Sequence, residues 1–390
     1  MGNAIAMTKL FRREWASRIF DALLPVFAAV AALLLGAVML WLLQANPLQA
    51  YRALWDGAFG SSNAIAETLV KATPLLLVAL GICIAFRGDV INIGGEGQMI
   101  IGAIFATWVG LYFTEWPGWV VISMAMAAGF IGGAIWGGIP GLLKAYFNVN
   151  EILSTVMMNS IAVYIMNFLL RGPMIDPSQE RLASKIPQTA RLLDAFQLPR
   201  LAPTRLHLGI LIAVALAILV YIVLWRTTLG YRIRAVGQNP HASRYGGIKV
   251  KRYVVLALLL SGAFAGLAGA TQVFGVNYRM ITDGSASGFT GSAGFNGIVA
   301  ALFGQLHPIL SIPASILFGA LLVGANSMQR AVQVPSALVT VLNGLVVVFV
   351  VSSEIWRRRR QRRRLAADSP ESESPPGAQG EGAGGLKVGA

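Results

Sequence analysis

Charge is scarce in this chain. Only 12% of its 390 residues are Asp, Glu, Lys or Arg, while 56% are hydrophobic; an ordinary soluble domain is roughly a quarter charged. Apolar runs of about 18 to 25 residues recur, long enough for a helix to cross a hydrocarbon core about 30 Å thick. A membrane β-barrel would instead show alternating segments of about ten residues. The composition therefore predicts an all-α, polytopic membrane helical bundle.

Cysteine, histidine and catalytic motifs are equally scarce. The single cysteine, Cys83, lies inside an apolar run and excludes an intramolecular disulfide. The histidines are only three, His207, His241 and His307, and no His, Cys and carboxylate cluster has the spacing of metal ligands. The patterns G-x-x-x-x-G-K-[ST], H-E-x-x-H and G-x-S-x-G are missing. We therefore expect no enzyme, no metal and no cofactor in this chain; ATP would be bound by a partner subunit.

The apolar runs predict about ten transmembrane helices, with eight as the alternative because two of the segments are rich in glycine. Positive charge orients them: seven basic residues lie between Arg226 and Arg252, and seven arginines in the run RRRRQRRR at 357–364. Both places, and the basic N-terminus, are expected inside. The first apolar stretch favours a retained helix over a cleaved signal peptide. The expected spans are 23–44, 66–86, 90–112, 119–143, 151–170, 207–225, 253–275, 290–306, 308–326 and 335–353.

Composition divides the chain into three parts. Residues 1–22 form a cytoplasmic or interfacial N-terminal segment, and residues 23–353 form the transmembrane domain. Residues 354–390 are first basic and then rich in Ser, Pro, Gly and Glu, which is typical of a disordered tail. Beside a membrane exit, the arginine run favours an anchor to anionic lipid over a nucleic-acid site. We therefore expect contact with the lipid membrane and none with nucleic acid.

An inverted repeat is visible in two glycine-rich lead-ins, NIGGEGQMIIGAIFA at 92–106 and GSAGFNGIVAALFG at 291–304. They occupy matching places in two five-span halves of opposite orientation. Glycine-interrupted segments so placed indicate the substrate path of a transporter, because non-helical backbone at membrane depth must line water or be buried in protein. The alternative is that the glycines only permit close helix packing. Candidates for the translocation path are Asn92, Glu96, Gln98, Asn159 and Asn296.

Two of these candidates have a competing structural interpretation. A buried carboxylate is costly, so a structural or gating role is favoured for Glu96 over contact with solute. Asn159 and Asn167 lie about 80° apart on one helix, where they would line a path or, as we favour, hydrogen-bond another helix. Asn150 and Glu151 open the same helix as a cap.

The basic inside loop contains the sequence GYRIRAVGQNPHASRYGGIKVKRY at 230–253. Asn239 can cap a helix that has Pro240 at its first position, and Gly246 and Gly247 can end it. The pattern predicts a short helix, PHASRY, across the inner face. A plain basic loop is the alternative.

Four segments in order, FRGDVINIGGEGQMIIGA, NEILSTVMMNSIAVYIMNFLLRGP, AVGQNPHASRYGGI and GFNGIVAALFGQLHP, resemble permease subunits of ABC importers for branched-chain amino acids, monosaccharides and nucleosides. The resemblance is nearest to the nucleoside and simple-sugar group, covers about residues 23–353, and implies two pseudo-symmetric halves. The polyarginine run and the tail depart from the family pattern. By resemblance, the ATPase-coupling loop comprises Gly237, Asn239, Pro240, Ala242, Tyr245 and Gly247.

The resemblance implies a function and partners. We expect a multi-pass permease of the bacterial plasma (inner) membrane that moves a neutral polar solute by alternating access. An ATP-binding cassette ATPase subunit, an extracytoplasmic solute-binding protein and a second permease chain, identical or related, would complete the importer. The few charges within the spans argue against ion coupling. The alternatives are a branched-chain amino acid permease, a self-sufficient secondary transporter and a membrane scaffold.

Overall fold

The computed structural model describes residues 33–179, 185–201 and 203–333, with isolated positions at 27–31 and 341–352. The first expected span, 23–44, is represented by the helix Leu33–Leu42. Most of the expected span 335–353 lies outside the described residues, as do the N-terminal segment 1–22 and the tail 354–390 with its arginine run.

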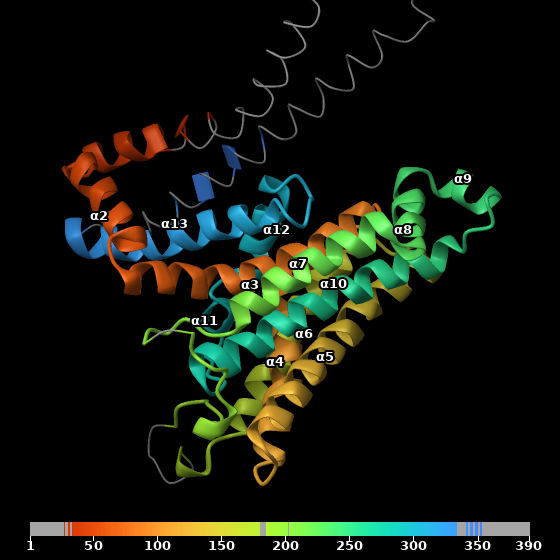
Figure 1. The fold of residues 1–390 in the computed structure, drawn as a ribbon, viewed down its shortest axis with the longest axis horizontal. Helices are drawn as coiled ribbons and strands as arrows, with labels where there is room; N and C mark the ends of the chain where they lie inside the picture. The colour runs from red at the N-terminus through yellow and green to blue at the C-terminus, as the bar shows by residue number, and fades with distance from the viewer. Residues whose placement is uncertain are drawn as a thin grey trace, which may run out of the picture.

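The described chain is all-α, as predicted (Figure 1). No strand forms among the described residues, where two isolated bridges join Gln188 to Ile281 and Arg200 to His207. The α-helices are α2 (Pro47–Phe59), α3 (Ser62–Arg87), α4 (Gly95–Tyr112), α5 (Gly118–Phe147), α6 (Glu151–Arg171), α7 (Gly209–Arg226), α8 (Thr228–Gln238), α9 (Pro240–Tyr245), α10 (Val250–Gln272), α11 (Ala286–Thr290), α12 (Ala293–Phe303) and α13 (Ser311–Val332). Short 3-10 turns at Pro177–Gln179 and Asp194–Phe196 and a π-turn at Val273–Asn277 complete them.

Six helices of the described chain are long and apolar enough to cross a membrane: α3, α5, α6, α7, α10 and α13. The protein is therefore a multi-pass membrane protein, although the full count of ten spans stays a prediction. Two expected spans, 90–112 and 290–306, begin too early. Residues 90–94 are not helical before α4, and α12 has 11 residues, about 16 Å at 1.5 Å per residue, which is too short to cross alone.

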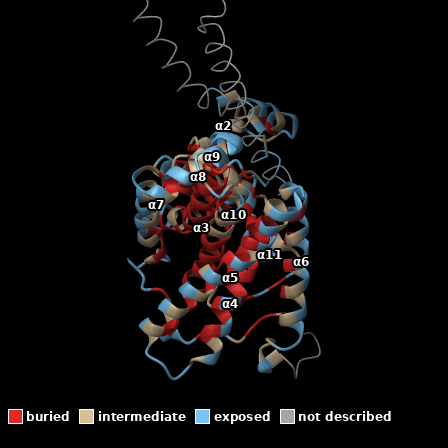
Figure 2. Ribbon diagram, turned by 90° about the vertical axis from the view of Figure 1, so that its right-hand side faces the viewer, coloured by how far each residue is buried: buried red, intermediate tan, exposed pale blue. Residues whose placement is uncertain are grey.

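Helices α3 and α10 form the buried centre of the bundle, and α5, α6 and α7 surround them with more exposed faces (Figure 2). Small residues let α10 approach its neighbours closely. A Cβ on Gly102 of α4 would overlap the backbone of Gly266 of α10, and a Cβ on Gly133 of α5 would overlap the carbonyl of Gly262. Close packing, the alternative explanation for the glycines, is thus confirmed for Gly102.

The bundle has two distinct ends (Figure 1). We call the end that carries α8 and α9 the arm end. The opposite end, here called the loop end, holds residues 172–179, 185–201 and 203–208 of the long connection before α7. It also carries exposed aromatic residues, as is common at a membrane–water interface; they are Trp108, Tyr112, Trp116 and Trp119. Two helices were not expected from the sequence: α2, which packs on α13, and α8 in the basic loop.

Candidate functional site

The first turns of α4 and α12 meet inside the bundle. A Cβ on Gly294 would overlap the backbone nitrogen of Glu96, and one on Gly95 would lie 3.3 Å from the Cα of Gly294. Helix α4 then runs to the loop end, where Gly110 packs against Leu192 and Phe274. Helix α12 runs the other way and ends where Gly304 meets Ser311 of α13. The helices that follow the two glycine-rich lead-ins therefore start at one junction and run in opposite directions.

The carboxylate of Glu96 lies in this junction. Its side chain is buried, and its Oε1 atom accepts a hydrogen bond of 3.1 Å from the backbone N–H of Phe295. Glu96 is also in the first turn of α4, so the carboxylate faces the starts of two helices. Helix N-termini carry partial positive charge and unpaired N–H groups. Both stabilise a buried carboxylate, and no Lys or Arg is paired with it among the described residues.

A second group of polar side chains holds the lead-in before α4 against α10. The side-chain amide of Asn92 donates to Gln98 at 2.9 Å and to Ser261 of α10 at 2.8 Å. Its Oδ1 atom accepts from the backbone N–H of Gly94 at 2.9 Å. Asn92 and Gln98 are both buried. These bonds pair polar groups that would otherwise be unsatisfied in an apolar environment.

Asn159 of α6 hydrogen-bonds to backbone groups on both sides of the first residue of α4. Its Oδ1 atom accepts from the N–H of Gly97 at 2.8 Å, and its Nδ2 atom donates to the carbonyl of Ile93 at 3.0 Å. Asn167, two turns on, bonds instead to Thr282 and Gly284. The expectation that these asparagines hydrogen-bond another helix is confirmed for Asn159, which accepts from Gly97 of α4. The partners of Asn167 are non-helical residues before α11.

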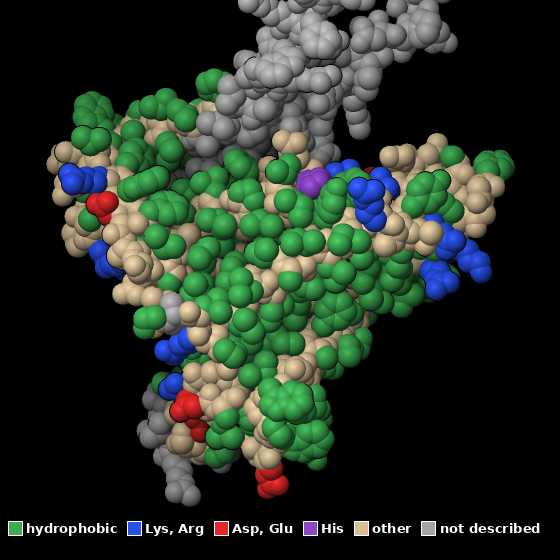
Figure 3. Space-filling view, viewed as in Figure 1, with side chains coloured by type: hydrophobic (Ala, Val, Ile, Leu, Met, Phe, Trp, Pro, Cys, Tyr) green, Lys and Arg blue, Asp and Glu red, His purple; other side chains and the backbone are tan. Residues whose placement is uncertain are grey.

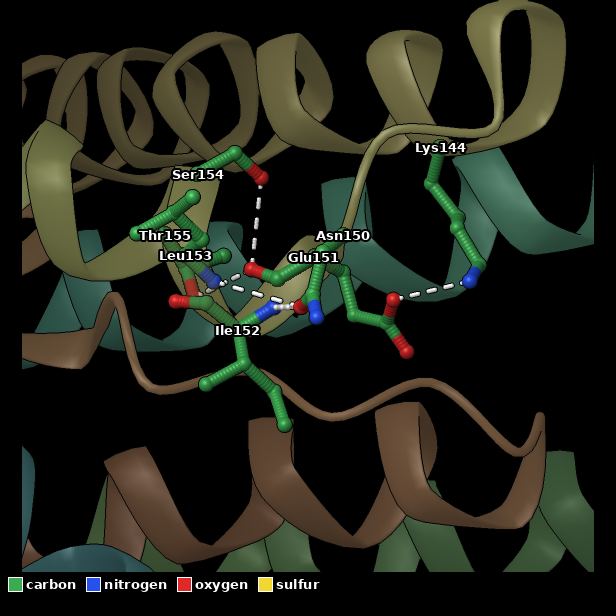
Figure 4. A network of polar contacts seen from close by, with 7 residues as sticks. All are labelled: Lys144, Asn150, Glu151, Ile152, Leu153, Ser154 and Thr155. Carbon is green, nitrogen blue, oxygen red and sulfur yellow. Dashed lines mark hydrogen bonds and ion pairs between the residues drawn. The ribbon is translucent and has the colours of Figure 1, made fainter.

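The start of α6 is itself fixed to α5 (Figure 4). The side chain of Asn150 accepts from the N–H of Ile152 at 2.9 Å and from that of Leu153 at 3.4 Å, which confirms the expected cap. Glu151 forms an ion pair of 2.9 Å with Lys144, near the end of α5. This corner sets the position of α6, and with it the position of Asn159.

Asn296 differs from the other four path candidates. It is only partly buried, and among the described residues its side chain makes no hydrogen bond, although its backbone N–H bonds to Ser292. It follows Phe295, which is exposed. The structure thus gathers Asn92, Glu96, Gln98 and Asn159 around the start of α4, although only Asn92 and Gln98 hydrogen-bond to each other. Asn296 lies beside them on α12.

The predicted short helix forms at the arm end as α9. Asn239 accepts from the N–H of Ala242 at 3.0 Å, Pro240 takes the first position, and the helix ends before Gly246. Gly247 has a φ of 76°, a left-handed conformation that glycine adopts without strain. Tyr245 is 96% exposed. A groove of about 700 Å³ separates α9 from α8 and the start of α10; its lining includes Tyr231, Arg232, Asn239, Ala242, Gly246 and Arg252.

A cluster of basic and aromatic side chains connects α8 and α9 to the rest of the bundle. A Cβ on Gly237 of α8 would overlap the carbonyl of Arg87, at the end of α3. The guanidinium of Arg87 lies 5.2 Å from the centre of the Trp225 ring of α7 and donates to the carbonyl of Leu306 at 3.3 Å. The ring of His307 is 5.0 Å from that of Trp225. The base of the arm therefore contacts the turn between α12 and α13.

Comparison with known proteins decides the family. The family model described as the branched-chain amino acid transport system permease component matches residues 64–351. The chain belongs to this family. It is the membrane-spanning permease subunit of an ABC importer, and so a transport protein rather than an enzyme.

Characterised relatives cover most of the permease. It is 36% identical over 336 residues to a guanosine ABC transporter permease protein of Bacillus subtilis, covering 86% of the permease and 94% of that relative. A glucose ABC transporter permease protein of Haloferax volcanii is 33% identical over 367 residues, 91% and 93% of the two chains. A nucleoside ABC transporter permease protein of Lactococcus lactis is 32% identical over 333 residues, 84% and 90% of the two chains. No solved structure matches the permease.

Sequence reasoning missed several residues of these two sites in the permease. Ser261, which accepts from Asn92, lies 169 positions further along the chain. The cluster of Arg87, Trp225 and His307 likewise joins three separate segments. No local pattern marks such partners, because a serine or tryptophan in an apolar helix is common whether or not it has a polar neighbour.

Proposed function

We propose that the permease imports a nucleoside or a simple sugar across the plasma membrane of a bacterium. Two observations support this substrate class. Relatives at 32% to 36% identity over most of the chain are named for guanosine, glucose and nucleosides. The polar groups of the path candidates are mostly neutral amides, which suit a hydroxylated solute and not an ion-driven cycle.

The arm end is proposed to face the cytoplasm, since the basic loop 226–252 belongs to it. There α9 would dock into an ATP-binding cassette ATPase subunit, with Gly237 and Asn239 shaping the loop and Tyr245 making contact. The loop end would receive solute from an extracytoplasmic binding protein. A second permease chain, identical or related, would complete the path.

In this mechanism the junction of α4 and α12 is the part that moves. Movement of α9 would be transmitted to Gly237 of α8 and from there to Arg87. Arg87 would pass it to Leu306, in the turn after α12. Because α12 starts against Glu96, a shift of its far end changes the position of its first turn. Asn92, Gln98 and Asn159 would hold the α4 start in place, and Asn296, which is partly exposed on α12, would line the path.

The observation that carries this proposal is the exposure of Tyr245 at the tip of a capped, well-defined helix outside the bundle. The test replaces Tyr245 by Asp and Gly247 by Glu in the assembled importer and measures ATPase stimulation by loaded binding protein together with uptake. We expect both to be lost while the chain stays folded, and Tyr245→Phe to retain both. Undiminished stimulation and uptake would contradict docking at α9. Uphill transport by the permease alone would contradict the importer as a whole.

A further inference from the structure

A second groove, of about 860 Å³, runs along the flank of the arm end. Its floor and walls come from the last turns of α5 and the first turns of α10, and its roof from the connection between α9 and α10. The apolar lining consists of Leu142, Tyr146, Ile248, Val250, Val255, Leu256 and Leu259. More than half of the lining residues are therefore apolar.

The rim of this groove is strongly basic. Arg244, Lys249, Lys251 and Arg252 line it, all four are exposed, and no Asp or Glu belongs to the described lining. None of the four takes part in an ion pair of the described chain. The Nζ atom of Lys251 lies 5.1 Å from the ring centre of Tyr146. Lys144, which is on the same stretch of α5, is by contrast already paired with Glu151.

The groove extends from the basic end of the bundle to its exposed apolar surface. Leu259 is nine residues after Val250, the first residue of α10, so it lies about 14 Å along that helix. Leu142 is 49% exposed and continues the exposed apolar face of α5 at Ile135 and Ile139. Figure 3 shows the Lys and Arg side chains at the arm end next to this continuous hydrophobic surface. An occupant must therefore carry negative charge at the rim and apolar chains below it.

We propose that this groove binds an anionic phospholipid of the cytoplasmic leaflet, with the phosphate between Lys249, Lys251 and Arg252 and an acyl chain along Leu256 and Leu259. An acidic surface of the ATPase subunit would match the rim but could not cover apolar residues that continue into the bilayer. The lipid would join the end of α5 to the start of α10, beneath the arm. Basic residues at a membrane surface each strengthen binding of anionic lipid by about fivefold.

The test places a photo-crosslinker in the groove of the full chain. Tyr146, 59% exposed, is replaced by p-benzoylphenylalanine, and the chain is reconstituted in vesicles of equal parts phosphatidylglycerol and phosphatidylcholine. Tyr164 of α6, 73% exposed on the outer face of the bundle, carries the same crosslinker as the control position. We expect phosphatidylglycerol to be enriched at least fivefold at 146, which is about the contribution of a single basic residue, and not enriched at 164.

Charge variants then test the rim. Lys249→Gln with Lys251→Gln is expected to remove the enrichment at 146 and leave the crosslink yield at 164 unchanged, which also shows that the variant is folded. The matched pair Arg171→Gln with Arg226→Gln, two exposed arginines at helix ends, is expected to keep the enrichment. Equal lipid ratios at 146 and 164, or a ratio unaffected by the loss of the two lysines, would overturn the proposal. So would an ATPase subunit that crosslinks at 146 and displaces the lipid.

Discussion

The buried carboxylate of Glu96 accepts a hydrogen bond of 3.1 Å from the backbone N–H of Phe295, which is 199 positions away in the chain. One side chain in the first turn of α4 thus accepts from a backbone N–H at the start of α12. In the proposed cycle, α12 cannot move against α4 without breaking this bond or carrying Glu96 along. The bond therefore links the stability of the junction to its ability to move.

Glu96→Ala should destabilise the junction, because it removes the acceptor of the Phe295 N–H. We expect the free energy of unfolding to fall by about 1–3 kcal/mol, measured by thermal unfolding of the purified chain. Glu96→Gln keeps an acceptor oxygen and should cost less. Glu67→Ala is the control, since the Glu67 pair with Arg205 is partly exposed and such pairs contribute about 0–1 kcal/mol. If Gln is as harmful as Ala, the negative charge and not the hydrogen bond holds the junction.

Asn159→Ala should be more damaging than Asn167→Ala, although both change an asparagine of the same helix. Asn159 satisfies two backbone groups, on Gly97 and Ile93, so its loss should cost about 2–4 kcal/mol of unfolding free energy. Asn167 bonds to Thr282 and to the carbonyl of Gly284, in the connection before α11. Thermal unfolding and solute uptake measure the difference. Equal effects would mean that the start of α4 does not depend on Asn159.

The sequence predicted those parts of the permease that short-range rules control. Asn150 and Asn239 were recognised as caps, with Pro240 and Gly246 bounding α9, because capping depends on neighbours in the chain. The two glycine-rich lead-ins were recognised as counterparts. Their meeting at Gly95 and Gly294, and the partners of Glu96 and Asn92, were not predictable, since nothing in one half of a single sequence specifies which residues of the other half it contacts.

Two misjudged features have physical causes. The spans at 90–112 and 290–306 were drawn too long because hydropathy does not distinguish the helix from the non-helical residues before it, which are 90–94 before α4 and the turn at 291–292 before α12. Helix α8 was taken for loop, because its residues, which include Arg232 and Arg234, are polar on average and carry no apolar run. Its order comes from contacts with the bundle, such as Gly237 against Arg87.

Acid should destabilise the permease partly through His307, which lies in the turn between α12 and α13. Burial, and next the charge of Arg87, lower the pKa of His307 from its ordinary value of 6.5. Below pH 6.5, His307 therefore binds a proton more readily in the unfolded chain than in the folded chain. The stabilisation is fully present above pH 6.5 and is lost as the pH falls through the lower pKa of the folded state.

His307→Gln removes this titration, so the drop in unfolding temperature between pH 7.5 and pH 5.5 should be smaller in the variant than in the native chain. Both values are measured by thermal unfolding in the same detergent. His241→Gln, which changes an exposed histidine of α9, should keep the native drop. A native drop retained in His307→Gln would assign the acid sensitivity to other groups.

Gly237 and Gly246 lie on either side of α9. Replacing each of them by alanine gives a matched pair of variants that tests how movement of α9 reaches the bundle. A Cβ on Gly237 would overlap the carbonyl of Arg87, so Gly237→Ala must push α8 away from α3 and disturb the contact of Arg87 with Leu306. A Cβ on Gly246 would meet nothing closer than 3.6 Å, and its φ of −75° suits alanine. We expect Gly237→Ala to reduce uptake at least tenfold while ATP hydrolysis by the assembled importer persists, the pattern of an uncoupled motor; a tenfold change corresponds to about 1.4 kcal/mol. Gly246→Ala should retain both activities. If Gly237→Ala transports normally, the route from arm to junction does not pass through Arg87, and the connection of α9 to α10 would have to carry the motion instead.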